Sequence, residues 1–334
     1  MVRCGHGFQR YRRPVQKIPV IMDVDTGVDD ACALLLAALH PALHLRAVTC
    51  VSGNTDVDQV TRNTLGVLEI AGREDVPVAR GAQRPLIERP MHARHVHGED
   101  GMGDLGWVHT TREPDPRHAV ELLRETLETS TEQVTLVPTA PMTNIALLAR
   151  IYPEALRSVG RILFMGGAAR RGNATASAEF NVFHDAEATA IVLDAAAERG
   201  IPVTMYGLDV FYEPTVSRAR ARQLIASGAG PAARLAGELI EFQCERFESE
   251  QATIGDAGAV CAVIDPAGIG TTSLPVRVEL AGTWSRGRTI VDVRDWSGDL
   301  AHDPHGRADA MVDVALAIDG GRYADLWLDT VARG

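Results

Sequence analysis

The sequence predicts an α/β protein with a mainly parallel, doubly wound (Rossmann-like) sheet flanked by helices. Short apolar runs alternate with helical patterns along almost the whole chain, which is typical of parallel βαβ units. The first run also ends in a glycine turn that leads straight into an apolar helix. Because no internal repeat or low-complexity linker interrupts the pattern, we expect one domain over residues 18–334, after a basic extension of residues 1–17.

The composition limits the class of protein. The 334 residues are 46% hydrophobic and 23% charged, which is ordinary for a globular protein. The net charge of −11 argues against a nucleic-acid partner, and no apolar run reaches the ~18 residues of a membrane span. Five widely spaced cysteines form neither a zinc pattern nor a disulfide framework: Cys4, Cys32, Cys50, Cys244 and Cys261. We therefore expect a reducing, cytoplasmic location.

The stretch around the first predicted strand, 18–22, is the most informative part of the chain. The strand ends in four carboxylates, Asp23, Asp25, Asp29 and Asp30, and the helix 31–39 follows. Carboxylates packed at one turn repel one another and lose hydration, so their pKa values should rise unless a cation lies among them. Oxygen-rich surroundings favour a hard cation such as Ca²⁺ or Mg²⁺. The alternative is that Asp29 or Asp30 only caps the helix.

The remaining elements follow from the same two patterns, which are apolar runs bounded by turn residues and 3.6-residue periods. We expect strands at 45–51, 76–79, 133–138, 161–165, 201–206, 275–281 and 288–294, and helices at 57–71, 117–129, 145–150, 185–199, 217–227, 231–250, 257–264 and 307–318. Residues 81–111 have no clear period. A loop of this length inside a compact domain is usually functional or mobile.

Polar side chains gather where the predicted strands end. Asp25, Asn54 and Thr139 each follow a strand, and a polar loop covers residues 172–181. The carboxyl ends of parallel strands lie at one edge of a sheet, so these side chains should converge. Within the loop, Asn173, Glu179 and Asn181 are suited to binding the hydroxyl groups of a polyhydroxy ligand.

Five motifs resemble the inosine-uridine nucleoside hydrolase family along nearly the whole chain after residue 17. They are Asp23-Val-Asp-Thr-Gly-Val-Asp-Asp30, Gly53-Asn54, Val137-Pro-Thr-Ala-Pro-Met-Thr-Asn144, Met165-Gly-Gly167 and Gly172-Asn-Ala-Thr-Ala-Ser-Ala-Glu-Phe-Asn181. The last is long and specific. One departure is Thr26, where the family commonly has proline.

The resemblance implies Ca²⁺-dependent hydrolysis of the N-glycosidic bond of ribonucleosides, with release of base and ribose. It also implies a homodimer or homotetramer. The implied Ca²⁺ ligands are Asp25, Asp30, the Thr139 carbonyl and Asp256, with Asp25 also the general base that takes a proton from water. The implied ribose-binding residues are Asp29, Asn54, Asn173, Glu179, Asn181 and Asp256. Carboxylates of this kind would stabilise an oxocarbenium-like sugar.

The second departure from the family lies next to Asp256. Several members carry a histidine there that protonates the leaving base, whereas this chain has Gly255. His97 matches a family position near the base and is the candidate acid. Taken singly, His92, His95 and His97 are each expected to be polar loop side chains, and a zinc site made from them is the weaker alternative. Asp256 taken alone would be a helix cap.

The sequence alone does not decide the base preference, and it allows alternative functions. Residues 241–251 should border the base, and Phe242, Phe247 or Trp107 could stack on it or only pack in the protein. The lack of a basic cluster predicts a substrate without a 5′-phosphate. The alternatives are a haloacid-dehalogenase-like phosphatase, a catalytically silent nucleoside- or sugar-binding protein on the same scaffold, and a hydrolase of a modified or nicotinamide-type N-riboside.

Overall fold

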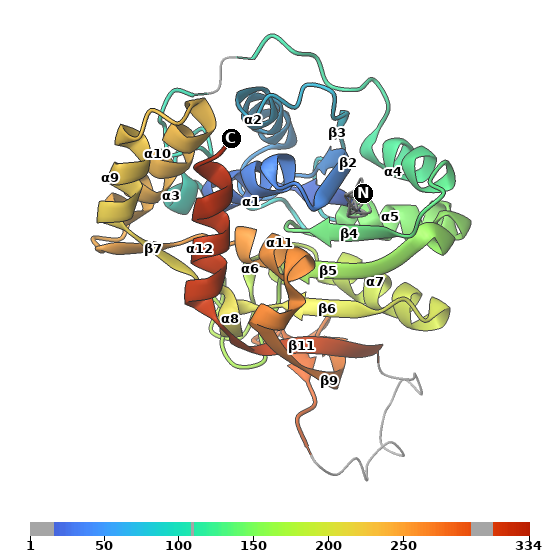
Figure 1. The fold of residues 1–334 in the computed structure, drawn as a ribbon. Coiled ribbons are helices and arrows are strands. Elements are labelled where there is room, and N and C mark those ends of the chain that lie inside the picture. The colour runs from blue at the N-terminus through green and yellow to red at the C-terminus, as the bar shows by residue number, and fades with distance from the viewer. Residues whose placement is uncertain (1–16, 108–109, 295–309) are drawn as a thin grey trace, which may run out of the picture.

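The computed structural model describes residues 17–107, 110–294 and 310–334. Within these ranges the chain forms a nine-stranded sheet with the strand order β10-β9-β11-β6-β5-β4-β1-β2-β3 (Figure 1). Its strands are β1 Ile18–Val24, β2 Leu43–Cys50, β3 Val78–Arg80, β4 Val134–Pro138, β5 Val159–Met165, β6 Val203–Tyr206, β9 Ile269–Val278, β10 Thr289–Val291 and β11 Ala310–Ile318. The short strands β7 Thr215–Ser217 and β8 Gln251–Thr253 pair separately.

The main sheet is parallel from β3 to β11, and β9 and β10 add an antiparallel edge. From β1 the chain builds outward through β2 to β3, then returns to place β4 on the other side of β1 and continues to β5 and β6. The order therefore reverses between β1 and β4. Open α/β sheets bind ligands beyond the carboxyl ends of the strands at such a reversal. The predicted doubly wound sheet is confirmed.

Helices cover both faces of this sheet. They are α1 Val28–Leu39, α2 Val57–Ile70, α3 Arg94–His97, α4 Ala119–Glu128, α5 Thr143–Ile151, α6 Phe180–His184, α7 Ala186–Arg199, α8 Leu208–Phe211, α9 Arg218–Ala226, α10 Pro231–Arg246, α11 Ala257–Ile264 and α12 Gly320–Val331, with 3-10 turns at Pro153–Ser158 and Pro266–Gly268. None of the helices in the described ranges is long and apolar enough to cross a membrane.

The two faces of the sheet have separate cores. Along β1, Val20, Met22 and Val24 pack into one cluster with α1, α2, α10, α11 and α12, whereas Ile21 packs into the other with α4, α5 and α7. Successive side chains of a strand point to opposite faces, so a strand covered on both sides must be apolar throughout. This is why β1 is a continuous apolar run up to its terminal acids.

One predicted element is wrong. Residues 310–318 of the expected helix 307–318 form strand β11, and residues 307–309 lie outside the described ranges, as do residues 1–16 of the basic extension. Strand β11 lies between β6 and β9, parallel to the first and antiparallel to the second. A short apolar run fits either a buried helix or a buried strand, and here pairing with two neighbours decides. The helix that follows, α12, was not predicted.

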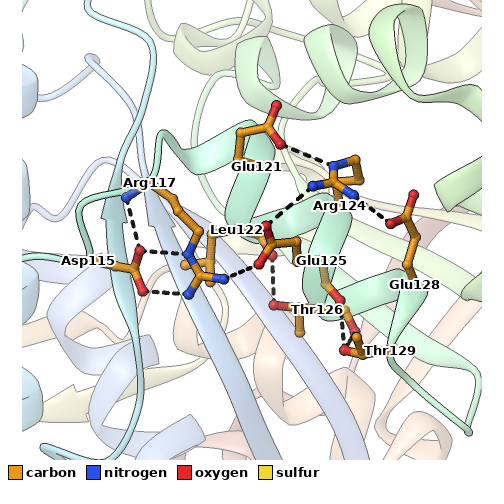
Figure 2. A network of polar contacts seen from close by, with 9 residues as sticks. All are labelled: Asp115, Arg117, Glu121, Leu122, Arg124, Glu125, Thr126, Glu128 and Thr129. Atoms are coloured by element: carbon orange, nitrogen blue, oxygen red, sulfur yellow. Dashed lines mark hydrogen bonds and ion pairs between the residues drawn. The ribbon is translucent and has the colours of Figure 1, made fainter.

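A charged network holds α4 against the segment before it (Figure 2). Arg117 binds both carboxylate oxygens of Asp115, with Nε 2.8 Å from Oδ1, and also pairs with Glu125. Arg124 on the helix contacts Glu121 and Glu128 at 3.0 Å and 2.6 Å. Such exposed pairs contribute little each, ~0–1 kcal/mol, but a network orders the side chains it joins. It lies on α4, whose apolar side packs on the sheet face opposite α1.

Candidate active site

The turn after β1 buries two carboxylates at the switch point, the place between β1 and β4 where the strand order reverses. Asp25 is 1% exposed, and its Oδ2 accepts a hydrogen bond from the Asn54 backbone N–H at 2.8 Å. Asp30 is fully buried, and its Oδ1 accepts from the Thr139 hydroxyl at 2.7 Å. A Cβ on Gly53 would lie 2.0 Å from Asp25 Oδ2, so only glycine lets the loop after β2 approach this closely. The ends of β1, β2 and β4 therefore converge as predicted.

Asp23, the first of the four carboxylates after the apolar run, belongs to a different hydrogen-bond network. Asp23 Oδ1 accepts from the Thr49 hydroxyl at 2.6 Å and from Asn144 Nδ2 at 2.8 Å. Burial raises the pKa of Asp23 to about 7. Its side chain therefore ties β1 to β2 and α5, whereas Asp25, Asp29 and Asp30 gather at the pocket.

Burial dominates the electrostatics of the acid cluster. Burial and then the charge of Asp30 raise the pKa of Asp25 well above its usual range, and burial followed by the charge of Asp29 raises that of Asp30 to about 7. The pKa of Asp256 is raised by burial and then by Asp29, Asp30 and Asp25. Carboxylates held together in this way lack a counter-charge.

The donor set fits a hard cation. Asp29, Asp30 and Asp256 each place a carboxylate oxygen within 4.8 Å of the others, and they form the one such group in the described part of the chain. Asp25 Oδ1 and Asp29 Oδ1 are buried and have no hydrogen-bond partner there. The Thr139 carbonyl accepts from Asn181 Nδ2 at 2.9 Å, which leaves its second lone pair for another contact. Oxygen ligands of this kind suit Ca²⁺.

Asp256 does not cap its helix. It stands at the N-cap position of α11 and is 3% exposed, but its side chain makes no capping hydrogen bond. The capping alternative is therefore wrong for Asp256, because its carboxylate lines the pocket beside Asp29.

The loop after β5 brings three polar side chains to the pocket. Glu179 caps α6 by accepting from the backbone N–H groups of Asn181 and Val182, and it also accepts from Gly167 N–H at 2.9 Å. Burial raises the pKa of Glu179 to about 7. Asn173 Oδ1 accepts from Phe180 N–H at 2.9 Å, which fixes the loop. Thus Asn173, Glu179 and Asn181 all line one cavity.

That cavity measures about 440 Å³. The predicted site residues that line it are Asp29, Asn54, His97, Thr139, Asn173, Glu179, Asn181 and Asp256. Asp25 and Asp30 lie directly behind, hydrogen-bonded to Asn54 and Thr139. No arginine or lysine of the described ranges lines the cavity.

The outer wall of the cavity is aromatic. It contains Phe180, Phe183, Phe211, Tyr212 and Phe247. Of the three rings that the sequence suggested could stack on the base, only Phe247 lines the cavity. Phe242 packs on Gly103, and Trp107 donates from Nε1 to Glu238 at 2.5 Å, so both serve packing.

Gln243 lies in the segment 241–251 that was expected to border the base, but it was not singled out there; it stands one turn before Phe247, the residue that caps the end of α10. It is 8% exposed, lines the cavity, and its Nε2 has no partner among the described residues. The i,i+4 spacing of the two residues on one helix face was the available signal.

His97 is a buried wall residue of the cavity, so the polar-loop expectation is wrong for it. Its Nδ1 accepts from Val28 N–H at 3.2 Å and lies 3.7 Å from Asp29 Oδ1. Because a backbone N–H can only donate, Nδ1 is unprotonated and the ring proton is on Nε2. Burial lowers the pKa of His97, partly opposed by Asp29. His92 differs, because its Nδ1 lies 3.1 Å from the Gly53 carbonyl and must donate.

Gly255 has a backbone reason to be glycine. Its φ is +54°, and a Cβ there would lie 2.5 Å from the Asp29 Cβ. A histidine could not occupy this position without moving Asp29 or the turn that carries Asp256. The departure from the family pattern is therefore built into the path of the chain.

We predict that Gly255→Ala lowers the free energy of unfolding by about 1–3 kcal/mol, through the left-handed backbone and the contact with Asp29. Thermal or urea unfolding measures this. Gly228→Ala is the matched control, since Gly228 also has a positive φ, +65°, but nothing within 4 Å of its Cβ position. Equal losses in the two variants would show that the Asp29 contact costs nothing.

The doubly wound sheet and the acid-lined pocket at its switch point define an α/β protein with a small-molecule site. Residues 20–325 match the family model described as inosine-uridine preferring nucleoside hydrolase, and the chain belongs to that family. It is therefore a hydrolase that acts on the N-glycosyl bond of ribonucleosides. Family membership sets aside the phosphatase alternative.

Curated relatives cover the full fold. The chain is 37% identical to a pyrimidine-specific ribonucleoside hydrolase, RihA, from Enterobacter sp., over 95% of this chain and 98% of the relative. It is 35% identical to the inosine-uridine preferring nucleoside hydrolase of Crithidia fasciculata, over 94% and 97%.

Solved structures agree with the fold. A plant nucleoside hydrolase, PpNRh1, superposes with a TM-score of 0.85 at 27% identity, over 95% of this chain and 99% of the other. An inosine-guanosine nucleoside hydrolase gives a TM-score of 0.85 at 28% identity, over 94% and 98%.

Proposed function

We propose that this protein is a Ca²⁺-dependent hydrolase that releases free base and ribose, with Asp25 as the general base. The main observation that supports this proposal is the environment of the Asp25 carboxylate. It is buried, its Oδ2 accepts a hydrogen bond from Asn54 N–H, and its Oδ1 has no hydrogen-bond partner among the described residues and lies beside Asp30. A carboxylate that one backbone hydrogen bond holds in place, with its second oxygen unpartnered, can accept a proton from a water beside it. One proton of the attacking water would pass to that oxygen.

The proposed cation ligands are Asp25, Asp30, the Thr139 carbonyl and Asp256. Of the group that lies within 4.8 Å, Asp30 and Asp256 are thus assigned to the cation and Asp29 to the ribose. A bound Ca²⁺ would lower the pKa of a coordinated water and hold two sugar hydroxyls. The proposed ribose contacts are Asp29, Asn54, Asn173, Glu179, Asn181 and Asp256. Carboxylates and amides together can accept from and donate to neighbouring hydroxyls, and the same negative groups stabilise positive charge developing on the sugar.

The substrate is a nucleoside without a 5′-phosphate. The carboxylates Asp29, Glu179 and Asp256 line the cavity, and no arginine or lysine of the described ranges lines it to offset a phosphate. The aromatic wall would hold the base. The named relatives differ in base, from pyrimidine-specific to inosine-guanosine.

Ribose release from inosine, guanosine, uridine, cytidine and nicotinamide riboside tests the function. We expect chelator-sensitive turnover of at least one ordinary nucleoside, and the preferred base identifies the specificity. Turnover of nicotinamide riboside alone would favour the modified N-riboside. No ribose from any of the five, with Ca²⁺ bound, would contradict the proposal. Homo-oligomerisation, the single domain and the cytoplasmic location stay predictions.

His97 is the proposed contact to the leaving base, through its Nε2–H. We predict that His97→Ala lowers kcat on the preferred nucleoside by about 10²-fold, the lower end of what a positioned proton donor contributes. Hydrolysis of 4-nitrophenyl β-D-ribofuranoside should change little, because nitrophenolate leaves without a donor. A similar loss on both substrates would assign His97 to the sugar side.

A further inference from the structure

A buried amide links two segments of the site. One is the acid turn, residues 25–30 after β1, and the other is the loop that carries His97. Asn63, in the middle of α2, is fully buried. Its Nδ2 donates to the Thr26 carbonyl at 3.1 Å and to the Asp100 carbonyl at 2.8 Å. Both protons of the amide nitrogen are therefore used, and they join two segments that are more than seventy residues apart in sequence.

The orientation of this amide is fixed by a chain of donors. Arg62, which can only donate, gives a hydrogen bond from Nη2 to Gln59 Oε1 at 2.7 Å. The Gln59 amide therefore presents Nε2 to Asn63 Oδ1, at 2.8 Å. Consequently Asn63 must present its nitrogen to the two carbonyls.

Both carbonyls belong to segments that act in the proposed reaction. Thr26 directly follows Asp25. Asp100 lies in the turn that returns to His97, where Gly103 N–H donates to the His97 carbonyl at 2.8 Å. The same two segments also meet through Val28 N–H and His97 Nδ1. Two independent ties of this kind set the position of the imidazole relative to the acid turn.

We propose that Asn63 is a positioning residue that holds His97 at the leaving base while Asp25 stays at the sugar. This inference rests on the proposed function. Asn63 does not line the cavity; it would act through the Asp100 turn. A displacement of about 1 Å between catalytic groups is enough to cost about 10²-fold in rate.

The test compares two substrates in Asn63→Leu, which keeps the volume and removes both donors. We expect kcat on the preferred nucleoside to fall by about 10²-fold, with 4-nitrophenyl β-D-ribofuranoside hydrolysis nearly unchanged. Adding His97→Ala to Asn63→Leu should cost no more than His97→Ala alone, because both remove one contact. Gln59→Met is the control: it removes the bonds that Gln59 makes to Asn63 Oδ1 and to Arg62 but leaves both Nδ2 bonds to the two carbonyls, so kcat should stay within about twofold.

Equal losses on the two substrates in a folded Asn63→Leu variant, or no loss on either, would overturn the inference. If that variant does not fold, Gly101→Ala displaces the turn instead: its φ is +77°, and its Cβ would lie 3.1 Å from Asn63 Nδ2. The same selective loss is expected, and unfolding of this variant too would make Asn63 a folding residue only. A wild-type protein inactive on every nucleoside contradicts the proposed function itself, before any variant is compared.

Discussion

Asp25→Asn should lower kcat by about a thousandfold on the preferred nucleoside, since a positioned general base contributes ~10²–10⁴-fold. The amide has the shape of the carboxylate and can keep the hydrogen bond from Asn54 N–H, so the fold should survive. What is lost is the proton acceptor beside Asp30. Steady-state kinetics, together with a thermal unfolding curve, measures both effects.

Asp23→Asn is the matched control for this variant. Asp23 is two positions away and equally buried, but its Oδ1 already accepts both available donors, Thr49 and Asn144. An asparagine carbonyl in that place keeps both bonds, so turnover should stay near that of the wild type. If Asp25→Asn kept near-normal kcat, or if both variants lost activity alike, Asp25 would not be the base.

Removal of the cation should abolish turnover and lower the melting temperature. A ligand that binds only the folded state stabilises it by RT ln(1 + [L]/Kd), so adding Ca²⁺ back should restore both quantities in a concentration-dependent way. Mg²⁺ in place of Ca²⁺ is the informative comparison, because Mg²⁺ demands a tighter octahedral arrangement. Full turnover after chelation, with metal loss confirmed by elemental analysis, would refute the role of the cation.

The stability of the protein, with and without Ca²⁺, should also depend on pH. Burial raises the pKa of Asp30 to about 7, above the ~3.9 of an unfolded aspartate. Between these values the folded metal-free protein binds more protons than the unfolded chain, so its stability should fall as pH rises from about 4 to 7. Ca²⁺ prefers the ionised carboxylates, so its stabilising effect should grow with pH over this range. Melting curves at several pH values, with and without Ca²⁺, measure both slopes.

The sequence was sufficient where local chemistry decides the structure. The apolar run before Asp23, the glycine turn and the apolar helix required a buried strand and helix. Parallel pairing then brought Asn54 to Asp25 and Thr139 to Asp30. It was insufficient where distant contacts decide. The run 310–318 is a strand because β6 and β9 lie on either side of it.

The residues around the proposed base position could not be predicted from local sequence either. The loop that carries His97 has no period, and its burial comes from contacts with Val28 and, through Asp100, with Asn63. The aromatic wall draws rings from α6, α8 and the end of α10, three separate parts of the chain. No local pattern marks such a surface.

The position of β11 has a consequence for how the protein is made. Among the described strands, β9 reaches β6 and the rest of the main sheet only through β11, which comes after both β9 and β10 in the chain. A growing chain that ends after β10 therefore has an antiparallel β9–β10 pair with no strand to join it to β6, and it leaves the edge of β6 unpaired. Unpaired strand edges in incomplete chains favour aggregation. Completion of the sheet must therefore wait until β11 is present and can pair with both β6 and β9.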